Sequence, residues 1–174
     1  MIDPFSLSTA HTAISVIAVL AGLISFIWHK EITPRSAWGR IYVLATIISV
    51  LTGIGIYNHG GFGPPHILGI VTLVVLRIGT AAGQRQFGAA SPYLEAVAFS
   101  ATFFFHMIPA IIEGATRLPL GKPLVASRED PVLLTAIGVC FGLFFIGVIL
   151  QIIRLRRQHA KPGLKLQSLT VPRI

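Results

Sequence analysis

The sequence predicts an all-α integral membrane protein with five transmembrane helices, a four-helix bundle (spans 1–4) plus a peripheral fifth helix. Of its 174 residues, 53% are hydrophobic and only 11% are charged, whereas about a quarter of the residues of a soluble domain are charged. The mean hydropathy is +0.78. Long apolar stretches alternate with short polar segments, and about 20 apolar residues suffice to cross a bilayer.

Five apolar stretches define the expected helices in chain order. We expect them at Ser8–His29, Ile41–Tyr57, Pro65–Thr80, Tyr93–Gly114 and Val132–Ile153. The first lacks the basic flank and the cleavage site of a signal peptide, so we expect it to be retained. Residues 1–153 would then form one transmembrane domain, and residues 154–174 a basic cytoplasmic tail with no hydrophobic period.

The segment Tyr57–Gly69 is the one polar break in a charge-free run from Ile41 to Leu76. Its glycines and prolines predict a sharp turn, and Pro65 suits the first turn of a new helix because its φ is already helical. His66 follows just inside that helix, at the rim of the apolar region.

Basic residues are distributed unequally between the two predicted sides of the membrane. Arg117, Lys122 and Arg128 fall on one side, and the other eleven of the 14 fall opposite. Because positive residues resist translocation, the rich side is expected to be cytoplasmic. This places the N-terminus outside and the C-terminus in the cytoplasm of a bacterial inner membrane. The charge is expected to contact anionic lipid rather than nucleic acid.

Small and polar residues recur at helical spacing and predict which faces point into the bundle. They are His11, Ser15, Ala18, Gly22, Ser25 and His29; Tyr42, Thr46, Ser49 and Gly53; His66, Gly69, Leu73 and Arg77; and Glu95, Phe99, Thr102, His106, Ala110 and Glu113. We expect Glu95 to pair with Arg77 or Arg85, and Glu113 with Arg117. In the fifth span, Thr135, Gly138 and Gly142 form a small-residue seam suited to packing against another helix.

Three histidines on three helices, His11, His66 and His106, are expected near one layer of the outer leaflet. Neutral imidazole binds haem iron, copper or zinc, and bundle cores hold such ligands. His11 with His66 or with His106 would supply a b-type haem, and the residues alone do not choose the pair. Ala18, Gly22 and Gly69 would leave room for the macrocycle. A copper or zinc ion held by all three is the alternative.

Structural roles explain the same histidines without a ligand. His66 would cap the turn by bonding to nearby backbone groups, and His106 would bond to a Thr or Ser across the bundle. His29 and His59 are typical of polar anchors at the membrane surface.

Two segments resemble a known family. Gly39-Arg40-Ile41-Tyr42 at the start of the second span and Gly63-Pro64-Pro65-His66 at the start of the third are similar to the small bacterial membrane proteins of domain of unknown function 2306. The resemblance covers His11 to Pro119. It implies a layout like that of b-type haem cytochromes, with His11 and His66 as ligand candidates. The family commonly has histidine where this chain has Ser36, so we expect no second haem there.

Two functions follow as hypotheses. The first is a membrane-bound electron-transfer protein that carries one haem b near the outer face and exchanges electrons with a quinone or a periplasmic partner. The second is a non-enzymatic accessory subunit of a larger membrane complex. The sequence has no nucleotide-binding loop, nucleophile elbow or paired inward carboxylates, so it indicates no particular catalysed reaction.

Overall fold

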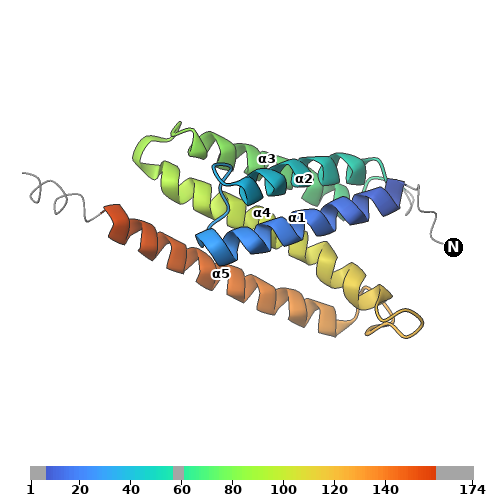
Figure 1. Ribbon diagram of the computed structural model, residues 1–174. Coiled ribbons are helices and arrows are strands. Elements are labelled where there is room, and N and C mark those ends of the chain that lie inside the picture. Colours follow the sequence, from blue (N-terminus) through green and yellow to red (C-terminus); the bar gives the residue numbers. More distant parts are fainter. Residues whose placement is uncertain (1–6, 57–60, 160–174) are drawn as a thin grey trace, which may run out of the picture.

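The computed structural model describes residues 7–56 and 61–159 (Figure 1). Within these ranges every regular element is helical: α1 (Leu7–His29), α2 (Ala37–Ile54), α3 (Pro64–Gly83), the short 3-10 turn η1 (Gly88–Ala90), α4 (Ser91–Arg117) and α5 (Pro131–His159). The five α-helices are each long and apolar enough to cross a bilayer. The predicted fold class, an all-α membrane protein, is therefore confirmed.

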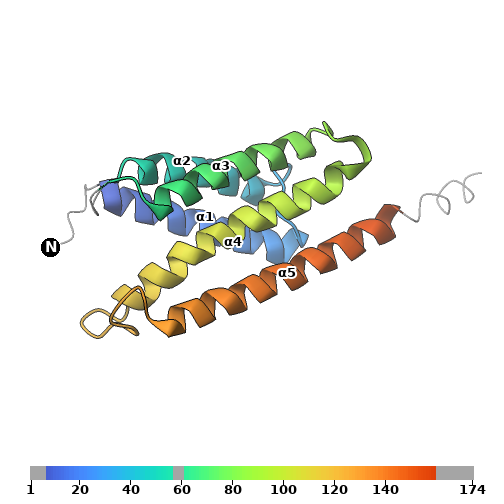
Figure 2. The same ribbon diagram turned by 180° about the vertical axis from the view of Figure 1, so that it is seen from behind.

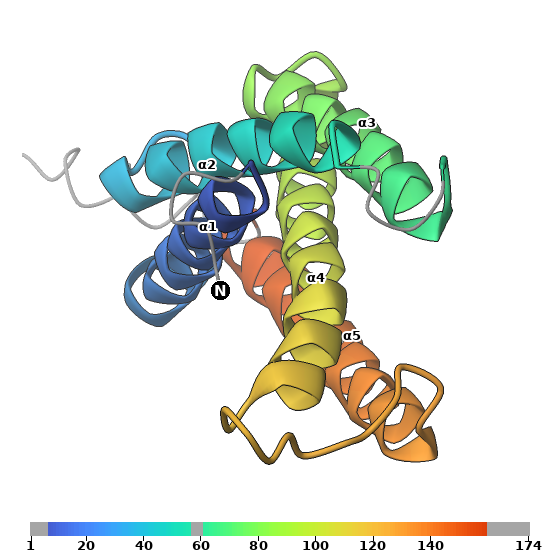
Figure 3. The same cartoon turned by 90° about the vertical axis from the view of Figure 1, so that its right-hand side faces the viewer.

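The first four helices pack as a bundle, and α5 lies outside it. Helix α1 packs on α2, α2 on α3 and α3 on α4, while α4 also touches α1. Figure 2 shows the same arrangement from behind, and Figure 3 shows α5 beyond α4, away from α2 and α3. Helices α1 and α4 diverge toward the end of the bundle that holds the start of α1 (Figures 1 and 3).

The helix ends that differ most from the prediction are the start of α2 and the end of α5. Helix α2 begins at Ala37 rather than Ile41, because Ser36 caps it: the Gly39 backbone N–H donates to Ser36 Oγ at 3.0 Å. Helix α5 continues beyond Ile153 to His159, since basic residues in a last turn interact favourably with the helix dipole. The predicted tail therefore begins as helix, and residues 160–174 lie outside the described residues.

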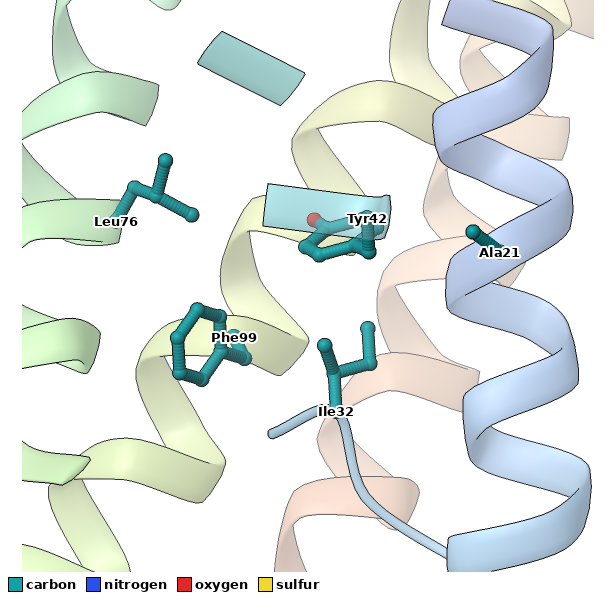
Figure 4. Packing of buried hydrophobic residues seen from close by; sticks show 5 residues of the cluster. All are labelled: Ala21, Ile32, Tyr42, Leu76 and Phe99. Atoms are coloured by element: carbon teal, nitrogen blue, oxygen red, sulfur yellow. The ribbon is translucent and has the colours of Figure 1, made fainter. Parts of the chain in front are cut away.

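The buried apolar centre joins all four helices of the bundle. Ala21, Tyr42, Leu76 and Phe99 come from α1 to α4, and Ile32 comes from the loop between α1 and α2 (Figure 4). Lipid offers helices no hydrophobic reason to associate, so helices in a bilayer depend on close packing. Small residues allow this close packing. The cluster lies in the half of the bundle opposite the start of α1.

Helix α5 also completes the C-terminal end of α1. A helix end leaves its last carbonyls without intrahelical donors. Three carbonyls at this end each accept a hydrogen bond from a side chain. The Lys30 ammonium donates to the Ile27 carbonyl at 3.0 Å, Gln151 to the Lys30 carbonyl at 3.1 Å and Arg154 to the His29 carbonyl at 3.0 Å. Two of these donors belong to α5, so the peripheral helix is tied to α1 by polar contacts.

The loop after α1 crosses α2 closely at Gly39. A Cβ at this position would collide with the backbone carbonyl of Thr33. We predict that Gly39→Ala lowers the free energy of unfolding by about 2 kcal/mol, because a backbone group cannot move aside as a side chain can. Gly114→Ala is the matched control, since its Cβ would meet nothing within 4 Å. Thermal unfolding in detergent should show a lower midpoint only for Gly39→Ala; equal midpoints would contradict the close approach.

Candidate functional site

A polar stripe on α2, formed by Tyr42, Thr46, Ser49 and Thr52, lies between the histidines of α1 and α4. Their spacing of three and four residues puts them on one face of the helix. Tyr42, Thr46 and Ser49 are buried. Polar side chains inside a bilayer need hydrogen-bond partners, because lipid supplies none. The stripe finds these partners on α1 and α4, as the sequence predicted for this face.

His11 of α1 is held by the Ser49–Thr52 end of the stripe. Its Nδ1 lies 2.9 Å from the Ser49 carbonyl oxygen and 3.2 Å from Thr52 Oγ1. A carbonyl only accepts, so this hydrogen bond assigns the proton to Nδ1 and leaves Nε2 unprotonated in the neutral ring. Gly53 permits the ring to lie against α2, because a Cβ there would come within 2.9 Å of His11 Cε1. This is the tautomer of a metal-ligating histidine.

Ser15 extends the contact one turn along α1. Its hydroxyl donates to the His11 carbonyl at 2.8 Å and lies 2.7 Å from Ser49 Oγ. The predicted stripe of α1 therefore faces α2 at His11 and Ser15 and is buried at Ala18, Gly22 and Ser25, whereas His29 is exposed.

His106 of α4 reaches the same stripe from the other side. It is buried, and its Nε2 lies 3.0 Å from Thr46 Oγ1. One turn along, the Tyr42 hydroxyl donates to Thr102 Oγ1 at 2.8 Å. The bond to a threonine across the bundle is the structural role that the sequence left open for His106.

His66 begins α3 and serves its own helix end. The Gly63 backbone N–H donates to His66 Nδ1 at 3.1 Å. Nδ1 is therefore an acceptor, and in a neutral ring the proton is on Nε2, the nitrogen that usually binds haem iron. Ligation through Nε2 would require the other tautomer and the loss of this cap. The capping role left open for His66 is the one that the structure shows.

The three histidines lie in the same half of the bundle but do not form one cluster. Across residues 7–56 and 61–159, no group of three or more histidine, cysteine or acidic side chains could hold a metal ion. His11 and His106 contact neighbouring turns of α2, while His66 contacts its own turn. His59 lies outside the described residues.

The room expected beside small residues is filled by neighbouring side chains. A Cβ on Gly22 would come within 2.6 Å of Phe103, and one on Gly69 within 3.1 Å of Val50. Ala18 is fully buried. The prediction that these positions leave room for a macrocycle was wrong: they are small because helices and aromatic rings approach closely there.

The acidic pairs of α4 follow the sequence only in part. Glu95 pairs with Arg35 at 2.8 Å and accepts a hydrogen bond from Thr33 at 2.9 Å. The prediction that Glu95 pairs with Arg77 or Arg85 was wrong, and Arg77 is exposed. The chain between α1 and α2 folds back over α4, and sequence spacing does not reveal such a contact. Glu113 pairs with Arg117, as predicted, and also with Arg128 at 2.6 Å.

The faces of α3 and α5 also differ from the prediction. The inner face of α3 is rotated away from Leu73 and Arg77, because its buried positions are His66, Thr72, Leu76, Gly79, Ala81 and Ala82. On α5, a Cβ at Gly138 or Gly142 would meet nothing within 4 Å. Helix α5 instead packs on α4 through aromatic rings, with Phe104 and Phe144 stacked at 5.4 Å between centroids.

Sequence reasoning missed a cleft of about 570 Å³ between α4 and α5, next to the end of α1. Its walls are mostly apolar, and none of its lining residues is a histidine. The aromatic residues Phe104, Phe141 and Phe144 recur on facing sides of α4 and α5, a pattern that indicates contact but not a hollow.

Comparison of the chain with family models, with curated proteins and with solved structures finds no match.

The Glu95 pair is the polar contact whose loss we expect to cost most stability. The Glu95 side chain is 8% exposed while that of Arg35 is 59% exposed. We predict that Glu95→Gln lowers the free energy of unfolding by about 1–2 kcal/mol, because the charge-assisted bonds to Arg35 and Thr33 weaken. Glu113→Gln, in a more exposed pair, should cost under about 1 kcal/mol. Chemical unfolding in detergent measures both, and an equal or reversed order would contradict this ranking.

Proposed function

We propose that this protein is a small membrane electron-transfer protein that carries one haem b, which His11 and His106 would hold. The observation that carries the proposal is the hydrogen bond from His11 Nδ1–H to the Ser49 carbonyl. This bond fixes the ring orientation and leaves Nε2 as the donor atom, as in metal sites whose ligands are oriented by backbone carbonyls.

The donor set fits a haem whose iron has two histidine ligands. Two neutral imidazoles come from helices α1 and α4, which diverge toward this end of the bundle (Figure 3). His106 is the better partner for His11, because His66 Nδ1 is occupied by the Gly63 N–H. Ligation by His106 would require its Nε2 to give up the Thr46 hydroxyl. When bound, haem supplies a one-electron redox centre, and the chain supplies ligands and burial.

The membrane orientation and the redox partners belong to the same proposal. With the basic end of the bundle in the cytoplasm of a bacterial inner membrane, His11 and His106 lie toward the outer face. Electrons would then pass to or from a quinone or a periplasmic protein. We also propose kinship with the family of domain of unknown function 2306, on the residues Gly39–Tyr42 and Gly63–His66. The Ser36 cap of α2 suits the expectation of a single haem.

Absorption spectra test the haem directly. The full-length protein, expressed with ample haem and purified, should show a Soret band that shifts on reduction with dithionite. We predict that His11→Ala or His106→Ala lowers the haem content at least about tenfold, because each removes one imidazole that would hold the haem. A featureless spectrum of the wild-type protein would overturn the proposal.

Two variants separate ligation from loss of structure. His66→Ala should keep the haem while lowering stability by about 1 kcal/mol, the usual cost of a lost helix cap. His29→Ala, at an exposed histidine of the same helix as His11, should change neither. If His66→Ala loses the haem and His106→Ala keeps it, the ligand pair assigned here is wrong.

A second candidate, an accessory subunit of a larger membrane complex, is favoured by the open face of α5. Gly138 and Gly142 leave this face smooth, and Leu134 and Phe145 beside them are exposed. If the face packs against another protein, Gly142→Trp should dissociate a complex that migrates above the monomer on native gels of mildly solubilised membranes. The matched control is Gly114→Trp on α4. A chain that migrates as a monomer before substitution would exclude this role.

A further inference from the structure

The cleft between α4 and α5 is an apolar hollow that opens toward lipid. Phe103, Phe104 and Phe144 form much of its wall, and Gly147 lies on its α5 side. Leu143 and Leu150 also line it and are exposed, so the hollow opens to the outside of the bundle. Its volume of about 570 Å³ is within the range of sites for small molecules, roughly 300–1,000 Å³.

Two cations mark one end of this cleft. Lys30 and Arg154 both line it and are both exposed. Their hydrogen bonds to the carbonyls of Ile27 and His29 hold the two side chains at this end of the cleft. A carbonyl is uncharged, so these bonds do not neutralise the two positive charges. Lys30 directly follows α1, and Arg154 follows the charge-free run of α5 from Pro131 to Ile153. Over that run α5 rises roughly 35 Å, enough to reach the headgroup region on one side.

The surrounding charge at this end of the bundle is also positive. Besides Lys30 and Arg154, the described basic residues here are Arg35, Arg40, Arg77, Arg85, Arg156 and Arg157, and the described acidic residues are Glu31 and Glu95. Glu95 is already paired with Arg35. At the opposite end, Arg117, Lys122 and Arg128 are balanced by Glu113, Glu129 and Asp130. An anionic headgroup is therefore favoured at the end of the cleft that holds the cations.

We propose that this cleft binds one anionic phospholipid, with an acyl chain between α4 and α5 and the phosphate between Lys30 and Arg154. Basic pockets between transmembrane helices recognise anionic headgroups in this way. The apolar walls hold the chain, and the two cations select the charge. The site is separate from the histidines of the proposed haem, because none of them lines the cleft.

Charge complementarity favours a phospholipid over an uncharged amphiphile such as a quinone. Ser100 and Gln151 also line the cleft, but they bond to one another at 2.9 Å, and Gln151 donates to the Lys30 carbonyl. These polar groups are thus engaged within the protein. The cationic groups of Lys30 and Arg154 are what the cleft offers to a headgroup.

Lipid retention tests the proposal on the full-length protein. The protein is reconstituted in vesicles of equal parts phosphatidylglycerol and phosphatidylcholine, extracted in mild detergent and examined by native mass spectrometry. We expect one retained phospholipid per chain, with phosphatidylglycerol enriched about tenfold. The pair Lys30→Asn and Arg154→Gln should abolish the enrichment; asparagine suits Lys30 because its φ is +65°. The charge-matched control, Arg40→Gln with Arg77→Gln, should keep it.

A second variant leaves the caps of α1 untouched. Gly147→Leu fills the cleft, since its Cβ meets nothing within 4 Å, and it should remove the retained phospholipid. Gly138→Leu, on the same helix but outside the cleft, should not. Equal retention in both leucine variants would overturn the site. So would equal enrichment in both charge variants, or retention of a neutral lipid that ignores the charge at Lys30 and Arg154.

Discussion

The bundle depends on the hydrogen bonds that the polar stripe of α2 makes to its neighbours. Inside a bilayer an unbonded hydroxyl or imidazole is costly, and apolar contacts alone do not favour helix over lipid. Ser49 therefore holds His11 and Ser15 of α1, while Thr46 and Tyr42 hold His106 and Thr102 of α4. These bonds set the register of three helices at once. The apolar cluster around Phe99, which shares Tyr42 with the stripe, packs the other half of the bundle.

The same constraint explains why α5 belongs to the protein although little of it is buried. The end of α1 leaves carbonyls that need donors, and Gln151 and Arg154 supply two of them from α5. Stacked aromatic rings complete the contact with α4. The cleft lies where these two contacts leave space between the helices. The side chains of Lys30 and Arg154 are held at the cleft by their hydrogen bonds to the last carbonyls of α1. The same two bonds therefore cap α1 and place the positive charges.

Structural need and ligand chemistry compete for the histidines. His66 Nδ1 accepts a hydrogen bond at the start of α3, so in the neutral ring the proton is on Nε2 and that nitrogen is not available to bind iron. His11 uses Nδ1 as a donor to a carbonyl, which presents Nε2 instead. The family-like Gly39 has a similar physical reason, because it lets the preceding loop cross α2, and Ser36 just before it caps the helix. A motif of this kind can persist for packing alone, so the haem proposal rests on His11 and not on the motif.

The sequence by itself determined the five helices, the peripheral place of α5 and the inward faces of α1 and α2, because hydropathy and helical period follow from local composition. It also named the Glu113–Arg117 pair, whose partners lie one turn apart. Only the tertiary structure decided that Glu95 meets Arg35, that α3 turns Arg77 outward, and that Gly22 and Gly69 are filled by Phe103 and Val50. It also decided the hydrogen-bonding roles of His11 Nδ1, His66 Nδ1 and His106 Nε2. These outcomes depend on how loops fold back and how helices rotate about their axes, and residues distant in sequence fix both.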